Sequence, residues 1–301
     1  MFDGMESAFA SREDRLPLVQ RMLSDAANST AAMTGSGLAA LGAAVDQTPR
    51  PIDAVDTGVA ATTGAHYGRL FERFSSKSFW DEPRELLRTR LERNGIPLDC
   101  IRDRSVLDAS CGGGRYSVAW RLLGARSVTG LDVSATGIGS ARDRVLSAGI
   151  DGVSFTQGDV LDLPCEDDAF DIVFSNGVLH HTVEWQRGVQ ELVRVLHPGG
   201  MGWLYLIEKP GGLFWDLIEI LRVIMHGESS QRVRTVLQSF GFSANRVYYM
   251  LDHVMVPINK RLTADEITDE LHLAGASGIR RLERGVDFDR VEATTGVIHS
   301  Y

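Results

Sequence analysis

Short apolar, β-rich runs alternate with helix-length segments along the chain from residue 105 onward. The runs cover residues 105–107, 127–131, 153–157, 172–175 and 202–207. Alternation of this kind predicts a parallel sheet with helices on both of its faces. We therefore expect an α/β fold with a doubly wound sheet, and a ligand site at the carboxyl ends of the strands.

The first 60 residues differ in composition from the rest of the chain. From residue 28 to about residue 59 they are rich in Ala, Gly, Thr and Ser, with Pro49 and Pro51 as breakers. Low hydrophobic bulk does not favour a packed core. Residues 1–60 are therefore predicted to be a low-complexity leader, either a flexible linker or a loosely docked cap.

Residues 61–104 are predicted to form a helical cap that precedes the first strand. Tyr67 and several other aromatic residues fall on one helical face. Asp81 and Pro83 are typical of a helix start, which predicts a second helix over residues 85–93.

A stretch of about 50 residues, 210–261, interrupts the sheet domain that we place at 61–301. It contains amphipathic segments at 213–225 and 232–240, and the first of these is too rich in charge to span a bilayer. Insertions at the carboxyl edge of such a sheet cover the ligand site, so we predict a helical lid here. The alternative is a homodimer interface.

Charge and cysteine content limit which binding partners and which cellular compartment we expect for this protein. The 301 residues hold 31 Lys and Arg against 40 Asp and Glu, a formal net charge of −9, which disfavours nucleic acid and anionic membranes as partners. The three cysteines show no CxxC spacing, which favours a reducing compartment and argues against structural zinc. Acids stand where a signal peptide needs basic residues, so we expect a cytoplasmic protein that needs no metal.

The segment 106–117 carries the clearest chemical signal. An apolar run ends at Asp108, and a glycine-dense turn with Gly112 and Gly114 leads into a predicted helix. Glycines let a backbone approach a ligand closely, and the helix start offers unpaired N–H groups. Ser110 replaces the first glycine of the dinucleotide fingerprint, and Asp108 would repel a pyrophosphate but pair with an ammonium group.

Two further acidic residues follow later strands. Asp132 ends the second run, where an acid accepts hydrogen bonds from both hydroxyls of a ribose. Asp159 follows the third run and is placed to accept a bond from an adenine amino group, while the N–H of Val160 is placed to reach a ring nitrogen.

Farther on, residues 198–200, Pro-Gly-Gly, are expected to end a helix.

Five motifs stand in order along residues 66–301: LDASCGGG, GLDVS, GDVLDLP, FDIVFSNGVLHH and RVLHPGG. In this order and spacing they resemble the class I S-adenosylmethionine-dependent methyltransferases, in particular the small-molecule group called methyltransferase type 11-like. The resemblance implies a Rossmann-like doubly wound sheet and S-adenosylmethionine as the cofactor. It also implies methyl transfer to an O, N, C or S nucleophile of a small molecule, in secondary or specialised metabolism.

The resemblance also assigns roles to individual residues. In the family, the turn lines the methionine end of the cofactor, the acids after it hold the ribose and the adenine, and the end of the fourth strand runs beneath the sulfonium. The matching residues here are Asp108, Ser110, Gly112 and Gly114 for the turn, Asp132 for the ribose, Asp159 and Val160 for the adenine, and Asn176 and Gly177 for the sulfonium. Tyr67 of the cap is expected to contact the sulfonium by cation–π attraction, and Ser110 departs from the usual glycine.

Three residues near the expected methyl group are candidate catalytic residues: His181, His180 and Glu208. A histidine there has the right ordinary pKa to act as a general base toward a substrate hydroxyl or amine. The structural interpretation, with one ring packed and one bonded to backbone, is favoured for the histidine pair. Glu208 is equally interpreted as a strand-end acid that bonds nearby backbone.

Other function classes stay open from the sequence. A non-catalytic S-adenosylmethionine-binding protein carries the same cofactor motifs. An NAD-dependent oxidoreductase shares the acid after the second strand, although Asp108 and Ser110 disfavour it. A nucleic-acid methyltransferase is disfavoured by the net charge and by SNGVLH in the fourth motif.

Overall fold

The computed structural model describes residues 76–207, 218–222, 225, 228–239, 241–242 and 244–282. The predicted leader 1–60, Tyr67 and Glu208 lie outside these ranges, as do residues 61–75 of the predicted cap and part of the predicted lid.

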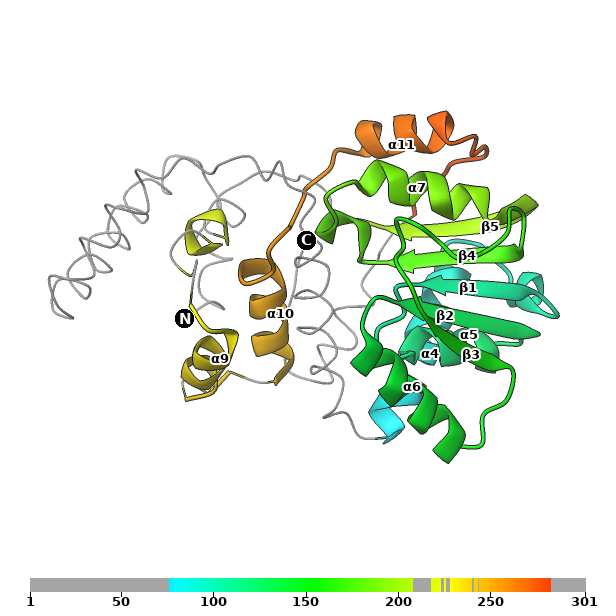
Figure 1. The fold of residues 1–301 in the computed structure, drawn as a ribbon. Helices are drawn as coiled ribbons and strands as arrows, with labels where there is room; N and C mark the ends of the chain where they lie inside the picture. The colour runs from blue at the N-terminus through cyan, green and yellow to red at the C-terminus, as the bar shows by residue number, and fades with distance from the viewer. Residues whose placement is uncertain are drawn as a thin grey trace, which may run out of the picture.

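Five parallel strands form one sheet in the described part of the chain (Figure 1). They are β1 Ser105–Ala109, β2 Ser127–Asp132, β3 Val153–Gln157, β4 Phe170–Asn176 and β5 Leu196–Tyr205. Their order is β3-β2-β1-β4-β5, so the chain winds one way from β1 to β3 and crosses back to β4 on the other side of β1. This is the doubly wound order, and the predicted fold class is confirmed.

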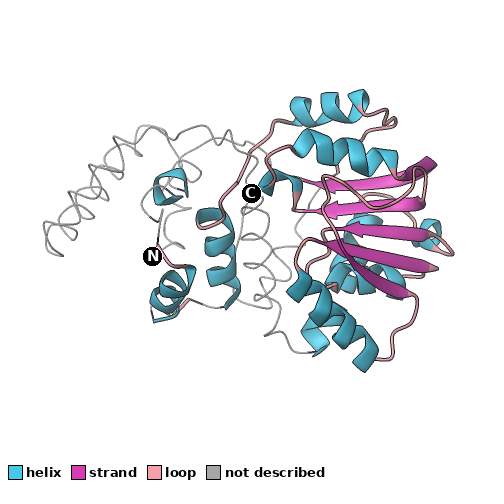
Figure 2. Ribbon diagram, viewed as in Figure 1, coloured by secondary structure: helices cyan, strands magenta, loops and turns pink. Residues whose placement is uncertain are grey.

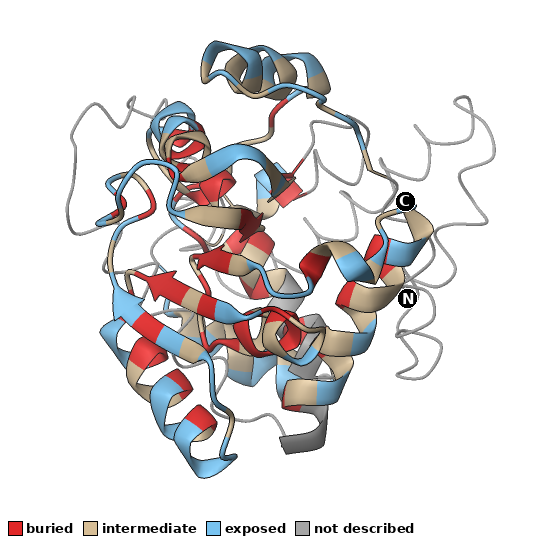
Figure 3. Ribbon diagram, turned by 90° about the vertical axis from the view of Figure 1, so that its right-hand side faces the viewer, coloured by how far each residue is buried: buried red, intermediate tan, exposed pale blue. Residues whose placement is uncertain are grey.

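Helices cover both faces of the sheet (Figure 2). On one face pack α4 Ser76–Arg93, α5 Arg115–Leu122 and α6 Ala135–Ser147, and on the other pack α7 Trp185–Arg194 and α11 Ala264–Leu273. Successive strand residues alternate between the faces: Val106 packs with α4 and α5, whereas Leu107 packs with α7. Both residues are fully buried, as expected of a parallel strand that helices cover on both faces. Figure 3 shows buried segments along the strands of the sheet.

Smaller elements complete the described part. A 3₁₀ turn, η2 Leu98–Ile101, precedes β1, and a second one, η3 Leu179–His181, follows β4. Residues 218–222 of the predicted lid region are helical, and two longer helices follow, α9 Ser230–Ser239 and α10 Ala244–Val254. In Figure 1 both lie beyond the end of the sheet, away from α7 and α11.

The expected helix start at Asp81 and Pro83 is wrong, because α4 begins at Ser76 and continues through Pro83. A proline inside a helix has no N–H for the carbonyl four residues earlier, here that of Phe79. Arg115, the first residue of α5, supplies a replacement, since its Nε donates to the Phe79 carbonyl at 3.5 Å. Its Nη2 also pairs with Glu82 at 3.0 Å, so α4 is tied to the start of α5.

The Pro-Gly-Gly motif does not end a helix either. Helix α7 ends at Arg194, and Pro198, Gly199 and Gly200 lie within the bounds of β5. Leu196 pairs with Phe170 and Met201 with Ile172, so the segment between Leu196 and Met201 bulges out of the β4–β5 ladder. Gly200 is required there because a Cβ atom would lie 2.7 Å from the carbonyl oxygen of Asp171.

Phe155 of β3 fills the space over two glycines. A Cβ atom on Gly130 of β2 would lie 2.6 Å from the Phe155 ring and 2.9 Å from the Cys111 sulfur. A Cβ atom on Gly114 would also lie 2.6 Å from this ring. The ring therefore packs directly on the backbone of β2 and of the turn that follows β1.

We expect Gly130→Ala to destabilise the protein by about 1–3 kcal/mol, because the added methyl group overpacks the contact with Phe155. Gly139→Ala is the matched control. Gly139 lies within α6 with open space around its Cα, so alanine there is expected to stabilise the helix by about 0.5–1 kcal/mol. Urea unfolding of both variants checks this, and equal midpoints for the two would contradict the packing described.

Candidate functional site

The turn between β1 and α5 has left-handed backbone at alternate residues. The φ angles are +68° at Ser110, +55° at Gly112 and +79° at Gly114. Ser110 therefore adopts the conformation of the glycine it replaces, at a cost of about 1 kcal/mol or more. The N–H of Cys111 donates to the carbonyl of Leu131 at 2.9 Å, which fastens the turn to the end of β2.

Asp108 ends β1 beneath this turn and is buried, with 2% of its surface exposed. The Ser117 hydroxyl of α5 donates to its Oδ2 at 2.6 Å. Burial raises the pKa of Asp108 to about 7, and repulsion from Asp132 acts in the same direction. No cation of the described residues contributes to that pKa, so a positively charged ligand group would find a buried carboxyl to pair with.

Asp132 at the end of β2 joins three pieces of the site. Its Oδ2 accepts the N–H of Gly112 at 2.8 Å, and its Oδ1 accepts the N–H of Ser134 at 2.8 Å. Burial raises the pKa of Asp132, while these two N–H groups lower it. Each carboxylate oxygen keeps a second lone pair, so the group retains capacity for two ligand hydroxyls.

Asp159 and Val160 follow β3 in a loop beside the end of β2. The N–H of Gly158 donates to the carbonyl of Asp132 at 3.0 Å, which brings the loop to the same edge of the sheet. Asp159 is exposed and its Oδ1 accepts the N–H of Leu161 at 2.9 Å, whereas the Val160 side chain packs in the core.

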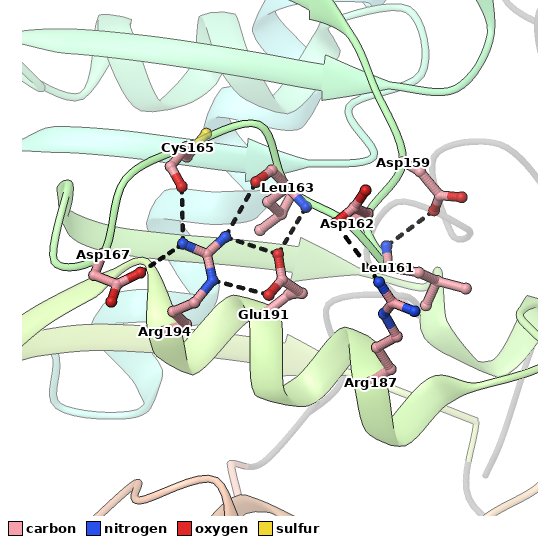
Figure 4. A network of polar contacts seen from close by, with 9 residues as sticks. All are labelled: Asp159, Leu161, Asp162, Leu163, Cys165, Asp167, Arg187, Glu191 and Arg194. Atoms are coloured by element: carbon pink, nitrogen blue, oxygen red, sulfur yellow. Dashed lines mark hydrogen bonds and ion pairs between the residues drawn. The ribbon is translucent and has the colours of Figure 1, made fainter.

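Helix α7 holds the rest of this loop in place (Figure 4). The Arg194 guanidinium donates to the carbonyls of Leu163 and Cys165 and to the carboxylates of Asp167 and Glu191, at 2.7–3.1 Å. Glu191 also accepts the N–H of Leu163 at 2.7 Å. Because one guanidinium bonds four groups on the loop and the helix, the position of Asp159 is set by α7 as well as by β3.

Asn176 and Gly177 lie where β4 ends. Asn176 pairs with Tyr205 of β5, and the N–H of Gly177 donates to the Tyr205 carbonyl at 3.0 Å. The φ angle of +81° at Gly177 turns the chain away from the strand toward η3. Since β4 is the neighbour of β1, both residues lie at the same sheet edge as Asp108.

The two histidines of η3 are buried and have different surroundings. His180 is 2% exposed, and its Nδ1 has no hydrogen-bond partner among the described residues. His181 places Nδ1 at 2.8 Å from the carbonyl oxygen of Ile258. A carbonyl only accepts, so Nδ1 carries the hydrogen and Nε2 carries the lone pair when the ring is neutral.

Burial lowers the pKa of both rings, strongly for His180. For His181 the carboxylate of Asp252 opposes this effect. His181 is therefore mostly a neutral imidazole at neutral pH. The contact with the Ile258 carbonyl gives His181 a structural role in the described part of the chain.

Sequence reasoning missed Asp252 of α10, whose Oδ1 lies 3.8 Å from Nε2 of His181. The two residues are far apart in the chain, and no spacing rule connects them. Of the other predicted site residues, the structure brings Asp108, Ser110, Gly112, Gly114 and Asp132 into one cluster. Asp159, Val160, Asn176, Gly177, His180 and His181 lie on the neighbouring strand ends of the same edge.

Two features are absent from the described ranges. None of the helices in them is long and apolar enough to cross a membrane. Nor do they contain a group of three or more His, Cys, Asp and Glu side chains placed to hold a metal ion.

Comparison with known proteins identifies the domain. Residues 107–204, which run from β1 to β5, match the family described as a methyltransferase domain. The phthiotriol/phenolphthiotriol dimycocerosates methyltransferase of Mycobacterium tuberculosis is 36% identical over 121 residues, which are 40% of this chain and 43% of that protein. The 27-O-demethylrifamycin SV methyltransferase of Amycolatopsis mediterranei is 31% identical over 153 residues, which are 48% of this chain and 56% of that protein.

A third relative is the malonyl-[acyl-carrier protein] O-methyltransferase of Pectobacterium atrosepticum, 35% identical over 122 residues that cover 40% of this chain and 46% of that protein. The chain thus spans about half the length of the curated relatives it matches. The family match at residues 107–204 covers most of the doubly wound sheet and its glycine turn. Residues 107–204 of this chain are therefore similar to methyltransferase domains.

Proposed function

We propose that this protein transfers the methyl group of S-adenosylmethionine to a nucleophilic atom of a small molecule. The observation that carries the proposal is the pair of buried carboxyl groups, Asp108 and Asp132, on either side of a left-handed turn. An ammonium group suits the first and a ribose diol suits the second. A pyrophosphate suits neither, which disfavours a dinucleotide cofactor.

The described residues have the chemistry that each part of this cofactor requires. Asp108 and the turn at Ser110, Gly112 and Gly114 hold the amino acid end, and Asp132 holds the ribose. Asp159 and the N–H of Val160 would hold the adenine, and Asn176 and Gly177 would line the sulfonium. Two further residues of the proposed site, Tyr67 and Glu208, lie outside the described residues. We assign Tyr67 a contact to the sulfonium, and Glu208 the role of an acid near the acceptor.

When bound, S-adenosylmethionine supplies an electrophilic methyl group on a positively charged sulfur. The chain's own residues have two tasks. The strand ends align the donor with the acceptor, since positioning alone contributes much of the rate of such a transfer. Nε2 of His181, a neutral base, takes the proton that an acceptor hydroxyl or amine loses.

Names of the relatives favour an oxygen acceptor. Two of them are named for O-methylation, of a demethylrifamycin and of malonyl-acyl carrier protein, and the third for a phthiotriol. Labelled methyl transfer to a panel of alcohols, phenols, carboxylic acids, amines and thiols tests the acceptor class. Cofactor binding without transfer to any of them would favour a non-catalytic binding protein.

We expect Asp132→Asn to weaken S-adenosylmethionine binding by about 1–3 kcal/mol, because the ribose loses charge-assisted hydrogen bonds. Asp143→Asn makes the same change of charge at an exposed position of α6 and is expected to leave affinity unaltered. Calorimetric titration checks both variants. Tight binding of NAD by the native protein, with none of S-adenosylmethionine, would refute the assignment.

Binding is also expected to release protons at about pH 6. With a pKa of about 7, Asp108 is mostly protonated there, and an arriving ammonium group favours the ionised form and so expels the proton. Calorimetry in buffers of different ionisation enthalpy counts the protons, about 0.5–1 for the native protein and fewer for Asp108→Asn. Equal counts for the two proteins would show that Asp108 does not face the ammonium group.

His181→Asn separates the chemical role of this residue from its structural one. Asparagine retains an amide N–H for the Ile258 carbonyl but has no basic nitrogen. We expect turnover to fall by about 10²–10⁴-fold with cofactor affinity unchanged. The exposed His197→Asn is the control, and native turnover in His181→Asn would leave His181 with the structural role alone.

A further inference from the structure

The first turn of α5 lacks the groups that usually stabilise a helix start. The helix is only eight residues long, and its N-cap residue, Gly114, has no side chain to accept the free N–H groups. No acidic residue stands in this first turn, and the first residue is Arg115, a cation at the end where the helix dipole favours anions. The start of α5 therefore needs support from another element.

Helix α4 provides this support. Glu82 of α4 accepts a hydrogen bond from Nη2 of Arg115 at 3.0 Å, which brings a carboxylate to the start of α5. Nε of Arg115 donates at 3.5 Å to the carbonyl of Phe79, which receives no N–H from Pro83. The side chains of Arg115 and Glu82 are 19% and 34% exposed, so water and salt screen the pair only in part. Arg115 is thus bonded to two points of α4.

The same part of α4 packs behind the cofactor turn. Phe79 is fully buried, and the guanidinium carbons of Arg115 and Arg144 lie 5.8 Å and 4.4 Å from the centre of its ring, one from α5 and one from α6. Trp80 packs on an apolar cluster that contains Cys111 of the turn. Helix α4 therefore contacts both helices that follow the first two strands, as well as the cluster to which the turn belongs.

Two supports hold the turn between β1 and α5 in its left-handed conformation. The N–H groups of Cys111 and Gly112 bond to the end of β2, and α4 fixes the residue that follows Gly114. If α4 released that residue, the start of α5 would fray and Gly114 would lose its place in the turn. A ligand binds only the molecules in which the turn is formed, so its apparent affinity falls with their fraction.

We propose that Glu82 and Arg115 are positioning residues for the turn that binds S-adenosylmethionine, so that α4 is part of the cofactor-binding unit. This inference rests on the proposed function. Helix α4 precedes residues 107–204, the part of the chain that matches the methyltransferase domain, so the cofactor-binding unit extends beyond the matched part. Because coupling between two binding or folding events is reciprocal, a bound cofactor also stabilises the start of α4.

The first test is a double-mutant cycle on cofactor affinity, with Glu82→Gln, Arg115→Gln and both changes together. We expect each single variant to weaken S-adenosylmethionine binding about 5–50-fold, and the double variant to bind no more weakly than Arg115→Gln alone. The cycle isolates the contact between the two side chains, whatever else either of them touches. Calorimetric titration measures the affinities. With the acceptor that the panel above identifies, kcat at saturating cofactor is expected to stay within about twofold of the native value.

Arg121→Gln is the matched control, because Arg121 makes the same pair of contacts from the last turn of α5. Its Nε donates to the carbonyl of Asp151 at 2.9 Å, and its Nη2 donates to the carboxylate of Asp151 at 2.7 Å. Its loss is expected to leave cofactor affinity unaltered. Arg115→Lys keeps the charge beside Glu82 but replaces the guanidinium fork by one ammonium group, and its affinity is expected to lie between those of Arg115→Gln and the native protein.

Hydrogen exchange in the native protein is the second measurement, and it needs no variant. We expect S-adenosylmethionine to slow the exchange of the amides at residues 80–87 of α4 by about threefold or more, and those of α11, on the other face of the sheet, by less. In Glu82→Gln the effect on α4 is expected to shrink. Thermal unfolding verifies that each variant is folded, and if Arg115→Gln is not, Glu82→Gln and the native protein still decide the outcome.

Two failures are distinguishable. A native protein that binds no S-adenosylmethionine would overturn the proposed function. Native binding, together with affinities of Glu82→Gln and Arg115→Gln that equal that of Arg121→Gln and an exchange of α4 that does not respond to the cofactor, would overturn the role of α4 alone.

Discussion

The carboxylate of Asp132 holds the candidate site together. It stands at the end of β2, bonds the N–H of Gly112 in the turn after β1, and bonds the N–H of Ser134 at the start of α6. Ser134 in turn caps α6 through its hydroxyl, which accepts the N–H of Gly137 at 3.1 Å. One buried side chain thus sets the relative positions of two strands, a turn and a helix. The ring of Phe155 reinforces the same junction from β3, because it packs on Gly114 and Gly130.

Burial shifts the pKa values of the acids and of the histidines at this edge in opposite directions. It disfavours charge on every group, so it raises the pKa of Asp108 and Asp132 and lowers that of His180 and His181. Asp108 is thereby poised to change its protonation when a cation arrives, and His181 is a neutral base. Both properties follow from desolvation at the carboxyl ends of buried parallel strands, where the doubly wound order gathers residues from separate parts of the chain.

Two expectations failed because a local rule was outweighed by tertiary contacts. Proline is typical of a helix start, yet Pro83 lies inside α4. Because proline has no N–H to donate to the Phe79 carbonyl, Arg115 of the next helix donates to that carbonyl instead. Pro-Gly-Gly is typical of a helix end, yet residues 198–200 form a bulge in β5, where Gly200 lies against the Asp171 backbone. In both cases the compensating partner lies on another element, which local propensity does not include.

Apolar runs, their spacing and the order of the motifs were enough to predict the sheet, its two-sided burial and the cofactor turn, since these depend on neighbours in the chain. They also predicted that Asp108, Asp132 and Asp159 share one edge, because parallel strands end on the same side. The sequence did not reveal that Ser110 adopts the left-handed backbone of a glycine, that Nδ1 of His181 bonds Ile258, or that Asp252 faces Nε2. Such contacts join residues remote in sequence, and only the packing of the insertion against η3 decides which side chain meets which.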